Sequence, residues 1–174
     1  RVAEDLGFEA GMFAGSIASL TVLGAPDIIV LTLSEFADQS RRICRAGELP
    51  LIVDADHGYG NALNVQRTVE ELENAGVACL TIEDTLLPRA FAQQDTEFLP
   101  LEEGVGKMKA ALAGRQDPDL IILGRTSAVG VNGVEDGLAR ARAYLDAGVD
   151  GIMFVGVKTR AQLDIIAAEL DAPI

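Results

Sequence analysis

Residues 51–60 of the chain read LIVDADHGYG, in which an apolar run ends at two aspartates one residue apart and a glycine lies on each side of a tyrosine. Side chains at positions i and i+2 of a β-strand point to the same face, so we expect Asp54 and Asp56 to point together from the carboxyl end of a strand. Two carboxylates so close are costly unless a cation neutralises them, and ligands that offer only oxygen suit Mg²⁺ or Mn²⁺ better than Zn²⁺. The stretch therefore predicts a metal site. In the alternative interpretation, one aspartate caps a helix and the other is solvated.

The wider sequence repeats one unit, in which a helical pattern ends at an Ala-Gly pair and an apolar run follows. Glycine just past a helix end takes up the left-handed conformation that terminates the helix. A nearly continuous apolar run is typical of a parallel strand that is buried on both faces. The Ala-Gly pairs lie at 46–47, 75–76, 113–114 and 147–148. The strands that we expect, as parallel neighbours in one curved sheet, lie at 12–14, 51–53, 78–82, 120–123 and 152–155.

Amphipathic helices are predicted between these strands. Val65 and Val69 share one helical face, and Leu163 and Ile166 share another, so we expect these side chains to pack on the sheet. The segment 32–45 begins with a threonine that is followed three residues later by a glutamate, which is the pattern of a capping box.

Repeated strand–helix units form either an open doubly wound sheet or a (β/α)8 TIM-type barrel. The chain has no GxGxxG fingerprint of a dinucleotide-binding sheet. Polar residues instead follow several different strands, and a site assembled from many strand ends is typical of the barrel. We therefore predict an α/β fold of the (β/α)8 TIM type. Because a complete barrel takes about 250 residues, we expect 1–174 to be a single barrel domain of about five to six βα units, a fragment that lacks the first and the last strands.

Composition limits the partners. The formal net charge of −13 argues against nucleic acid and anionic membranes. It does not argue against a small anionic substrate, because a cation and one arginine can reverse the field inside a cleft. Cys44 and Cys79 have no metal-binding spacing and are expected to be free thiols, and neither a signal peptide nor a membrane-length apolar run is recognisable. We therefore expect a cytoplasmic location.

The polar strand ends suggest a magnesium shell and a carboxylate clamp. Magnesium takes six oxygens and usually keeps several waters, so one direct aspartate with other carboxylates acting through water is a plausible shell. Arg125 offers a planar fork for a substrate carboxylate, or else forms a structural ion pair with Glu83 or Asp84. Ser16 either contributes to a site or caps a helix. His57, the only histidine, is interpreted as a hydrogen-bonding loop residue rather than a base, and Tyr59 as a packing residue.

Three runs carry a resemblance to a known family. The runs AGSIASLTVLGAPDIIVLTLSEF (14–36), DADHGYGNALNVQRTVEELENAGVACLTIEDTLLP (54–88) and LGRTSA (123–128) resemble the isocitrate lyase/phosphoenolpyruvate mutase superfamily, and within it most closely the oxaloacetate decarboxylases. The resemblance implies an α/β barrel, Mg²⁺ or Mn²⁺ dependence, an α-keto acid substrate, an enolate intermediate and a homo-oligomer, specifically a tetramer. By position it implies these roles: Asp54 as metal ligand, Asp56, Glu83 and Asp27 as acidic surround, Gly15 with Ser16 as cradle for a substrate carboxylate, and Arg125 as substrate-binding arginine.

Departures from the superfamily narrow the activity. The isocitrate and methylisocitrate lyases carry a catalytic cysteine on the loop that corresponds to 85–94, and this chain has none there. The loop pattern of the phosphonate enzymes is also absent, and Ser127 stands where many relatives have Asn or Asp. A tyrosine and a histidine used by decarboxylases of this type would fall beyond Ile174.

We therefore predict decarboxylation of oxaloacetate to pyruvate and CO₂ through an enolate stabilised by the metal, with Asp54 and Arg125 as the catalytic pair. One alternative is a C–C lyase that acts on a larger substituted malate, or a phosphonate-directed enzyme. Another is a barrel that keeps its metal site only for binding. The segment 85–99 has no periodicity and lies beside the predicted site, so we expect it to be a mobile lid.

Overall fold

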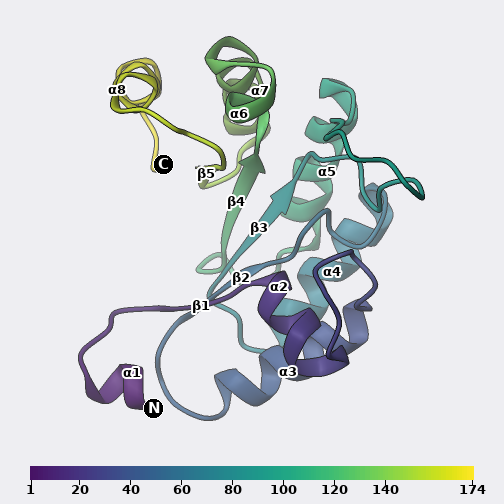
Figure 1. Cartoon of the computed structure of the whole chain (residues 1–174). Coiled ribbons are helices and arrows are strands. Elements are labelled where there is room, and N and C mark those ends of the chain that lie inside the picture. Colours follow the sequence, from purple (N-terminus) through teal and green to yellow (C-terminus); the bar gives the residue numbers. More distant parts are fainter.

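Five parallel strands form one sheet, and their order in space is their order in the chain (Figure 1). The computed structural model describes residues 1–174. The strands are β1 (Gly11–Phe13), β2 (Leu51–Asp54), β3 (Cys79–Glu83), β4 (Ile121–Thr126) and β5 (Gly151–Phe154). Each strand pairs in parallel with the next, as the apolar runs predicted. The one shift that matters for the site is in β4, which continues through Arg125 instead of ending before it.

Helices connect the strands and cover one face of the sheet. The helices are α1 (Val2–Asp5), α2 (Gly15–Ala18), α3 (Leu33–Cys44), α4 (Ala62–Asn74), α5 (Leu101–Gly114), α6 (Ala128–Val131), α7 (Val134–Ala147) and α8 (Arg160–Glu169), with a π-helical turn, η1 (Ser19–Leu23), after α2. Val53, Leu80 and Ile122 point toward the helices and are fully buried in the main core. A strand order without reversals and helices on one face form a segment of a TIM-type barrel, which confirms the predicted fold class.

The other face of the sheet is the inner face of the barrel segment. Strand register arranges its side chains in rows across the sheet: Met12, Ile52, Cys79 and Ile121 form one row, and Glu83, Arg125 and Met153 form the row nearest the carboxyl ends. Met12 is 56% exposed and Ile121 is 45% exposed. No helix of the structure is both long and apolar enough to cross a membrane.

Local sequence signals account for several of the helix boundaries. Thr32 and Glu35 form the predicted capping box at the start of α3, and equivalent boxes begin α4 and α8. Val65 and Val69 are buried on α4 as expected. The prediction for Leu163 is wrong, since this side chain is 44% exposed. Helix α8 packs mainly on α7, which leaves the face that carries Leu163 uncovered.

The Ala-Gly pairs serve two different purposes. Gly76 and Gly148 have φ angles of 89° and 107°, so these two are the left-handed helix ends that were predicted. The prediction is wrong for Gly47 and Gly114, whose φ angles are not positive. Gly114 is the last residue of α5, and a Cβ there would lie 2.5 Å from the carbonyl oxygen of Gln66 in α4. This glycine therefore permits a close contact between two helices.

Residues 85–99, which we call the cleft arm, join β3 to α5 above the carboxyl ends of the strands (teal in Figure 1). The arm folds back on itself: Thr85 and Phe98 form an antiparallel bridge, and the Leu86 amide donates to the Glu97 carbonyl at 2.8 Å. Phe91, at the far end of the arm, is fully exposed. No cysteine occurs in this segment.

Candidate active site

The carboxyl ends of β2, β3 and β4 bring three charged side chains together. Asp54 Oδ1 accepts hydrogen bonds from the Thr81 hydroxyl at 3.2 Å, from the Asp56 amide at 3.1 Å and from Arg125 Nη1. Arg125 lies opposite Glu83 in the strand register, and its Nη2 is 3.7 Å from Glu83 Oε2. Of the two structural ion pairs weighed for Arg125, the one with Glu83 is therefore present and the one with Asp84 is not.

Asp56 reaches the same site by a different route from the one expected. Strand β2 ends at Asp54, and Asp56 takes a left-handed φ of 48°, so the alternation of a strand is not what directs Asp56 to the site. The turn still brings the Asp56 carboxylate back toward the strand ends. A Cβ at Gly15 would lie 2.8 Å from an Asp56 carboxylate oxygen, and glycine at this position therefore leaves room for that side chain.

A cleft of about 620 Å³ opens above these residues. Its floor and walls include Asp27, Asp54, Asp56, Glu83 and Arg125, and its roof is formed by the cleft arm. Ser127 also lines the cleft. The residues of the arm that line the cleft are Thr85, Leu87, Arg89, Ala90, Phe91, Ala92, Gln93 and Thr96.

The predicted cradle lies beside this cleft rather than in its lining. Gly15 and Ser16 form the first turn of α2, directly after β1. The residue that caps this helix is Ala14, so the alternative role of Ser16 as a helix cap is wrong. Gly15 is buried against Asp56, whereas the Ser16 side chain is exposed.

The electrostatics of the cleft favour a cation. Burial, followed by the charges of Asp54, Glu83 and Asp27, raises the pKa of Asp56 to about 8. Burial also raises the pKa of Glu83. Burial alone would lower the pKa of Arg125, but Glu83 and Asp54 raise it, so the guanidinium stays charged. Two arginines, Arg125 on the floor and Arg89 on the arm, share the cleft with four carboxyl groups. A hard divalent cation that prefers oxygen ligands fits the remaining surplus of acidic groups.

No three acidic, histidine or cysteine side chains converge into a ready-made metal cluster. The prediction of one direct ligand, Asp54, with Asp56 and Glu83 acting through water does not require such a cluster. It stays a prediction.

His57 and Tyr59 do not line the cleft. The backbone carbonyl of His57 accepts a hydrogen bond from Lys107 Nζ at 2.8 Å, while its ring Nδ1 is buried without a partner. Burial lowers the pKa of this histidine to about 4. The expected side-chain hydrogen bond of His57 is therefore absent. Tyr59 packs near Phe36, with 6.1 Å between the ring centroids, in agreement with its interpretation as a packing residue.

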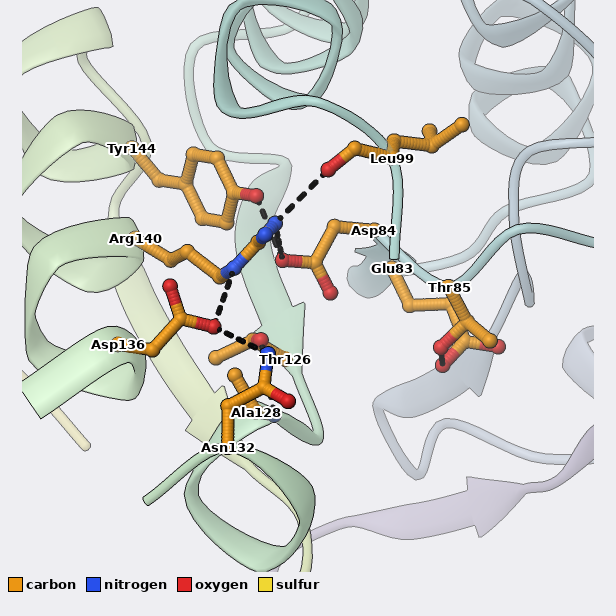
Figure 2. A network of polar contacts seen from close by, with 10 residues as sticks. All are labelled: Glu83, Asp84, Thr85, Leu99, Thr126, Ala128, Asn132, Asp136, Arg140 and Tyr144. Carbon is orange, nitrogen blue, oxygen red and sulfur yellow. Dashed lines mark hydrogen bonds and ion pairs between the residues drawn. The ribbon is translucent and has the colours of Figure 1, made fainter. Parts of the chain in front are cut away.

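Several polar residues of this region were not identified from the sequence. Thr81 and Thr85 donate to Asp54 and Glu83, and both lie two residues from Glu83, a spacing that could have indicated them. Asp84 points away from the cleft, to Arg140 and Tyr144 of α7 (Figure 2). Nothing in the local sequence around Arg140 indicates that contact, because its partner is 56 residues away.

Comparison with known proteins gives a consistent set of relatives. The model of the phosphoenolpyruvate phosphomutase family matches residues 1–174. An oxaloacetate decarboxylase of Bradyrhizobium diazoefficiens is 61% identical over 174 residues, which make up 100% of this chain and 60% of that protein. An oxaloacetate decarboxylase of Rhodopseudomonas palustris (strain BisB18) is 60% identical over the same shares of the two chains.

Solved structures with the same fold include enzymes of different activity. The structure of 2,3-dimethylmalate lyase has a TM-score of 0.90 and 29% identity, over 98% of this chain and 58% of that one. Phosphonopyruvate hydrolase in complex with oxalate and Mg²⁺ has a TM-score of 0.83 and 30% identity, over 99% of this chain and 60% of that one.

The chain thus spans about 60% of the length of the curated relatives that it matches. Within that span, the carboxylates and the arginine gather at the carboxyl ends of neighbouring strands, and the family model covers every residue. The chain belongs to the phosphoenolpyruvate phosphomutase family.

Proposed function

We propose that this chain carries the metal-dependent active site of an oxaloacetate decarboxylase, which converts oxaloacetate to pyruvate and CO₂. The observation that carries the proposal is the identity of about 60% to oxaloacetate decarboxylases along all 174 residues. The cleft supports it, because decarboxylation needs no nucleophile and the cleft arm contains no cysteine.

In this proposal Asp54 is the direct metal ligand, Asp56 and Glu83 act through water, and Asp27 completes the acidic surround. The oxygen donors suit Mg²⁺, with Mn²⁺ as the other candidate. When bound, the ion supplies Lewis acidity for the negative charge that develops on the keto oxygen as the C3–C4 bond breaks.

The remaining residues orient the substrate. Arg125 holds a carboxylate through two parallel hydrogen bonds. The backbone amides of Gly15 and Ser16, which lie beside the cleft, hold carboxylate oxygens of a substrate that extends toward α2. These contacts set the breaking bond perpendicular to the carbonyl plane, so that its electrons pass into the carbonyl system. Closure of the cleft arm excludes water from the reacting atoms.

A second candidate keeps the site but changes the substrate. The likeness to 2,3-dimethylmalate lyase and to phosphonopyruvate hydrolase supports a C–C lyase for a larger substituted malate, or a phosphonate-directed enzyme. A cleft of about 620 Å³ also has room for a substrate larger than oxaloacetate. A third candidate is a binding protein without turnover.

The test measures the turnover of three substrates in separate assays. Pyruvate formation from oxaloacetate is compared with turnover of 2,3-dimethylmalate and of phosphonopyruvate. We expect turnover of oxaloacetate that EDTA abolishes and that Mg²⁺ or Mn²⁺ restores. Asp54→Asn should abolish turnover, whereas Asp38→Asn, a change at an exposed residue of α3, should not. A kcat/KM on 2,3-dimethylmalate or on phosphonopyruvate that is higher than the kcat/KM on oxaloacetate would support the second candidate. Magnesium binding without turnover would support the third.

The proposal also includes a homo-oligomer, specifically a tetramer, and a cytoplasmic location. Two free cysteines, Cys44 and Cys79, are compatible with a reducing compartment. Sedimentation analysis of the purified protein tests the oligomeric state, and a monomer would contradict this part of the proposal.

A further inference from the structure

A buried polar cluster outside the cleft connects β3 to α7 (Figure 2). Asp84 and Tyr144 have no exposed surface, and Arg140 is 8% exposed. Asp84 Oδ2 accepts hydrogen bonds from the Tyr144 hydroxyl at 2.6 Å and from Arg140 Nη1 at 3.0 Å. None of the three residues lines the cleft, so the proposed chemistry does not account for them.

Arg140 contacts both ends of the cleft arm. Asp84 is the residue directly before the arm, and Leu99 is its last residue. Arg140 Nη1 donates to the Asp84 carboxylate and also, at 3.2 Å, to the Leu99 carbonyl. The Leu99 amide in turn donates to the Asp84 carbonyl at 2.9 Å, and the guanidinium lies 5.1 Å from the ring centroid of Phe98. The Arg140 side chain thus reinforces the backbone hydrogen bonds that join the beginning and the end of the arm.

The guanidinium is itself fixed by its own helix. Arg140 Nε donates to Asp136 Oδ2 at 3.1 Å, and the Asn132 side-chain amide donates to the same oxygen at 2.8 Å. A guanidinium carries its donors in a rigid plane, so fixing Nε also fixes the direction of Nη1. Helix α7 therefore determines where the two ends of the arm meet.

The residues on either side of Asp84 belong to the cleft. Glu83 precedes it and points to the opposite face of β3, and Thr85 follows it and donates to Glu83 Oε2 at 2.9 Å (Figure 2). A shift of Asp84 must therefore move both neighbours. Removing Arg140 leaves the Asp84 carboxylate buried without its cation, which strongly destabilises the protein. An effect on geometry must therefore be measured separately from an effect on stability.

We propose that Arg140 is a positioning residue of the active site: it fastens the two ends of the cleft arm together and so holds Glu83 and Thr85 in place at the cleft. Its effect on turnover rests on the proposed function. Its effect on the arm does not, and the two can be measured separately.

The arm contains a single site for trypsin, which cuts after lysine and arginine, because Arg89 is its only residue of either kind. Arg89 is exposed but hydrogen-bonded to Gln94 and Thr96 within the folded arm. Trypsin needs an extended segment, so the rate of the cut between Arg89 and Ala90 reports how often the arm unfolds locally. In Arg140→Met we expect a rate at least about tenfold above that of the unchanged protein, since a lost hydrogen bond between charged groups shifts a local equilibrium by that order. Arg142→Met is the matched control, because Arg142 lies on the same helix and pairs with Glu169 instead. Its rate should not change.

Two milder variants keep the proposal testable if Arg140→Met does not fold. Tyr144→Phe removes one hydrogen bond to Asp84 and keeps the packing, and it should speed the cut less than Arg140→Met does. Arg140→Lys keeps the charge but cannot contact Asp84, Leu99 and Asp136 at once, so it should lie between the unchanged protein and Arg140→Met. The kcat on oxaloacetate, measured per folded molecule, should fall in the same order in which the cut becomes faster. Arg140→Lys should therefore keep more of the kcat than Arg140→Met does.

The possible outcomes separate this proposal from the proposed function. Unchanged cutting after Arg89 in all three variants, or a lower melting temperature with normal kcat in the folded fraction, would overturn the role of Arg140. If the unchanged protein does not turn over oxaloacetate but the Arg140 variants are still cut faster after Arg89, the role of Arg140 in holding the arm would be supported. The proposed function would then be wrong.

Discussion

Arg125 makes contact with two carboxylates at once, those of Asp54 and Glu83. A guanidinium can keep such contacts and still offer a planar edge to a substrate, whereas lysine offers one compact charge on a flexible stem. The substitution Arg125→Lys can therefore separate the contribution of this residue to catalysis from its contribution to stability.

We expect Arg125→Lys to lower kcat/KM on oxaloacetate by about 10²-fold, the size of effect that a misplaced reacting group produces. The charge is kept, so the melting temperature should change little. Both quantities are measured on the same preparation, with Arg142→Lys as the control. An unchanged rate together with reduced stability would make Arg125 a structural residue only.

At the residue scale, the sequence predicts which side chains gather at the site better than it predicts their conformations. Asp54, Glu83 and Arg125 lie at the ends of apolar runs, and parallel strands end at a common edge. The left-handed turn at Asp56 was not predicted, since an alternating pattern looks the same whether the strand continues or ends. The role of Arg140 was not predicted either, because its contacts depend on how α7 packs against β3.

At the scale of elements, two glycines of helix α5 have different surroundings. Gly114 lies against α4, whereas a Cβ at Gly106 in the same helix would have no neighbour within 4 Å. We expect Gly114→Ala to destabilise the protein by about 1–3 kcal/mol through overpacking. Gly106→Ala should stabilise it by about 0.5–1 kcal/mol, because alanine has the higher helix propensity.

Urea unfolding of these two glycine variants measures both effects. A Gly114→Ala variant as stable as the unchanged protein would mean that α4 and α5 do not pack as closely as the structure describes. The close contact of Gly114 was not predictable from the sequence, because an Ala-Gly pair at a helix end indicates a left-handed residue and carries no information about a neighbouring helix.

The cleft arm should be the most mobile element of the chain. It has one bridge and a few backbone hydrogen bonds, and its tip is fully exposed. We expect its amides to exchange with deuterium faster than those of β3, and to slow when oxalate and Mg²⁺ are added together. Hydrogen exchange followed by mass spectrometry measures both rates. Slow exchange without ligand would contradict a gating role.

At the scale of the whole molecule, negative charge acts both over the surface and inside the cleft. The net charge is −13, and four carboxylates line the cleft. Salt screens charges beyond about 10 Å at 0.1 M, so NaCl should relieve the general repulsion. A rise from low salt to 0.2 M NaCl should increase the melting temperature by about 2–4 °C, which corresponds to about 1 kcal/mol at this chain length.

Magnesium should do more than NaCl at equal ionic strength, because it also binds inside the cleft. Differential scanning fluorimetry across a matched series of the two salts tests this prediction. Equal effects of the two salts would mean that screening alone is responsible, and a melting temperature that falls with NaCl would contradict the role of general repulsion.

The alternating faces of β3 limit how this family can vary. Glu83 and Asp84 are neighbours in the chain, yet one faces the cleft and the other faces Arg140. A one-residue insertion or deletion within β3 would exchange their faces, because side chains alternate along a strand. The carboxylate then aimed at the cleft would come from the wrong position, and a buried arginine would lose its partner. Related sequences can therefore differ in the side chains of β3, but alignments of the family should contain no gap there.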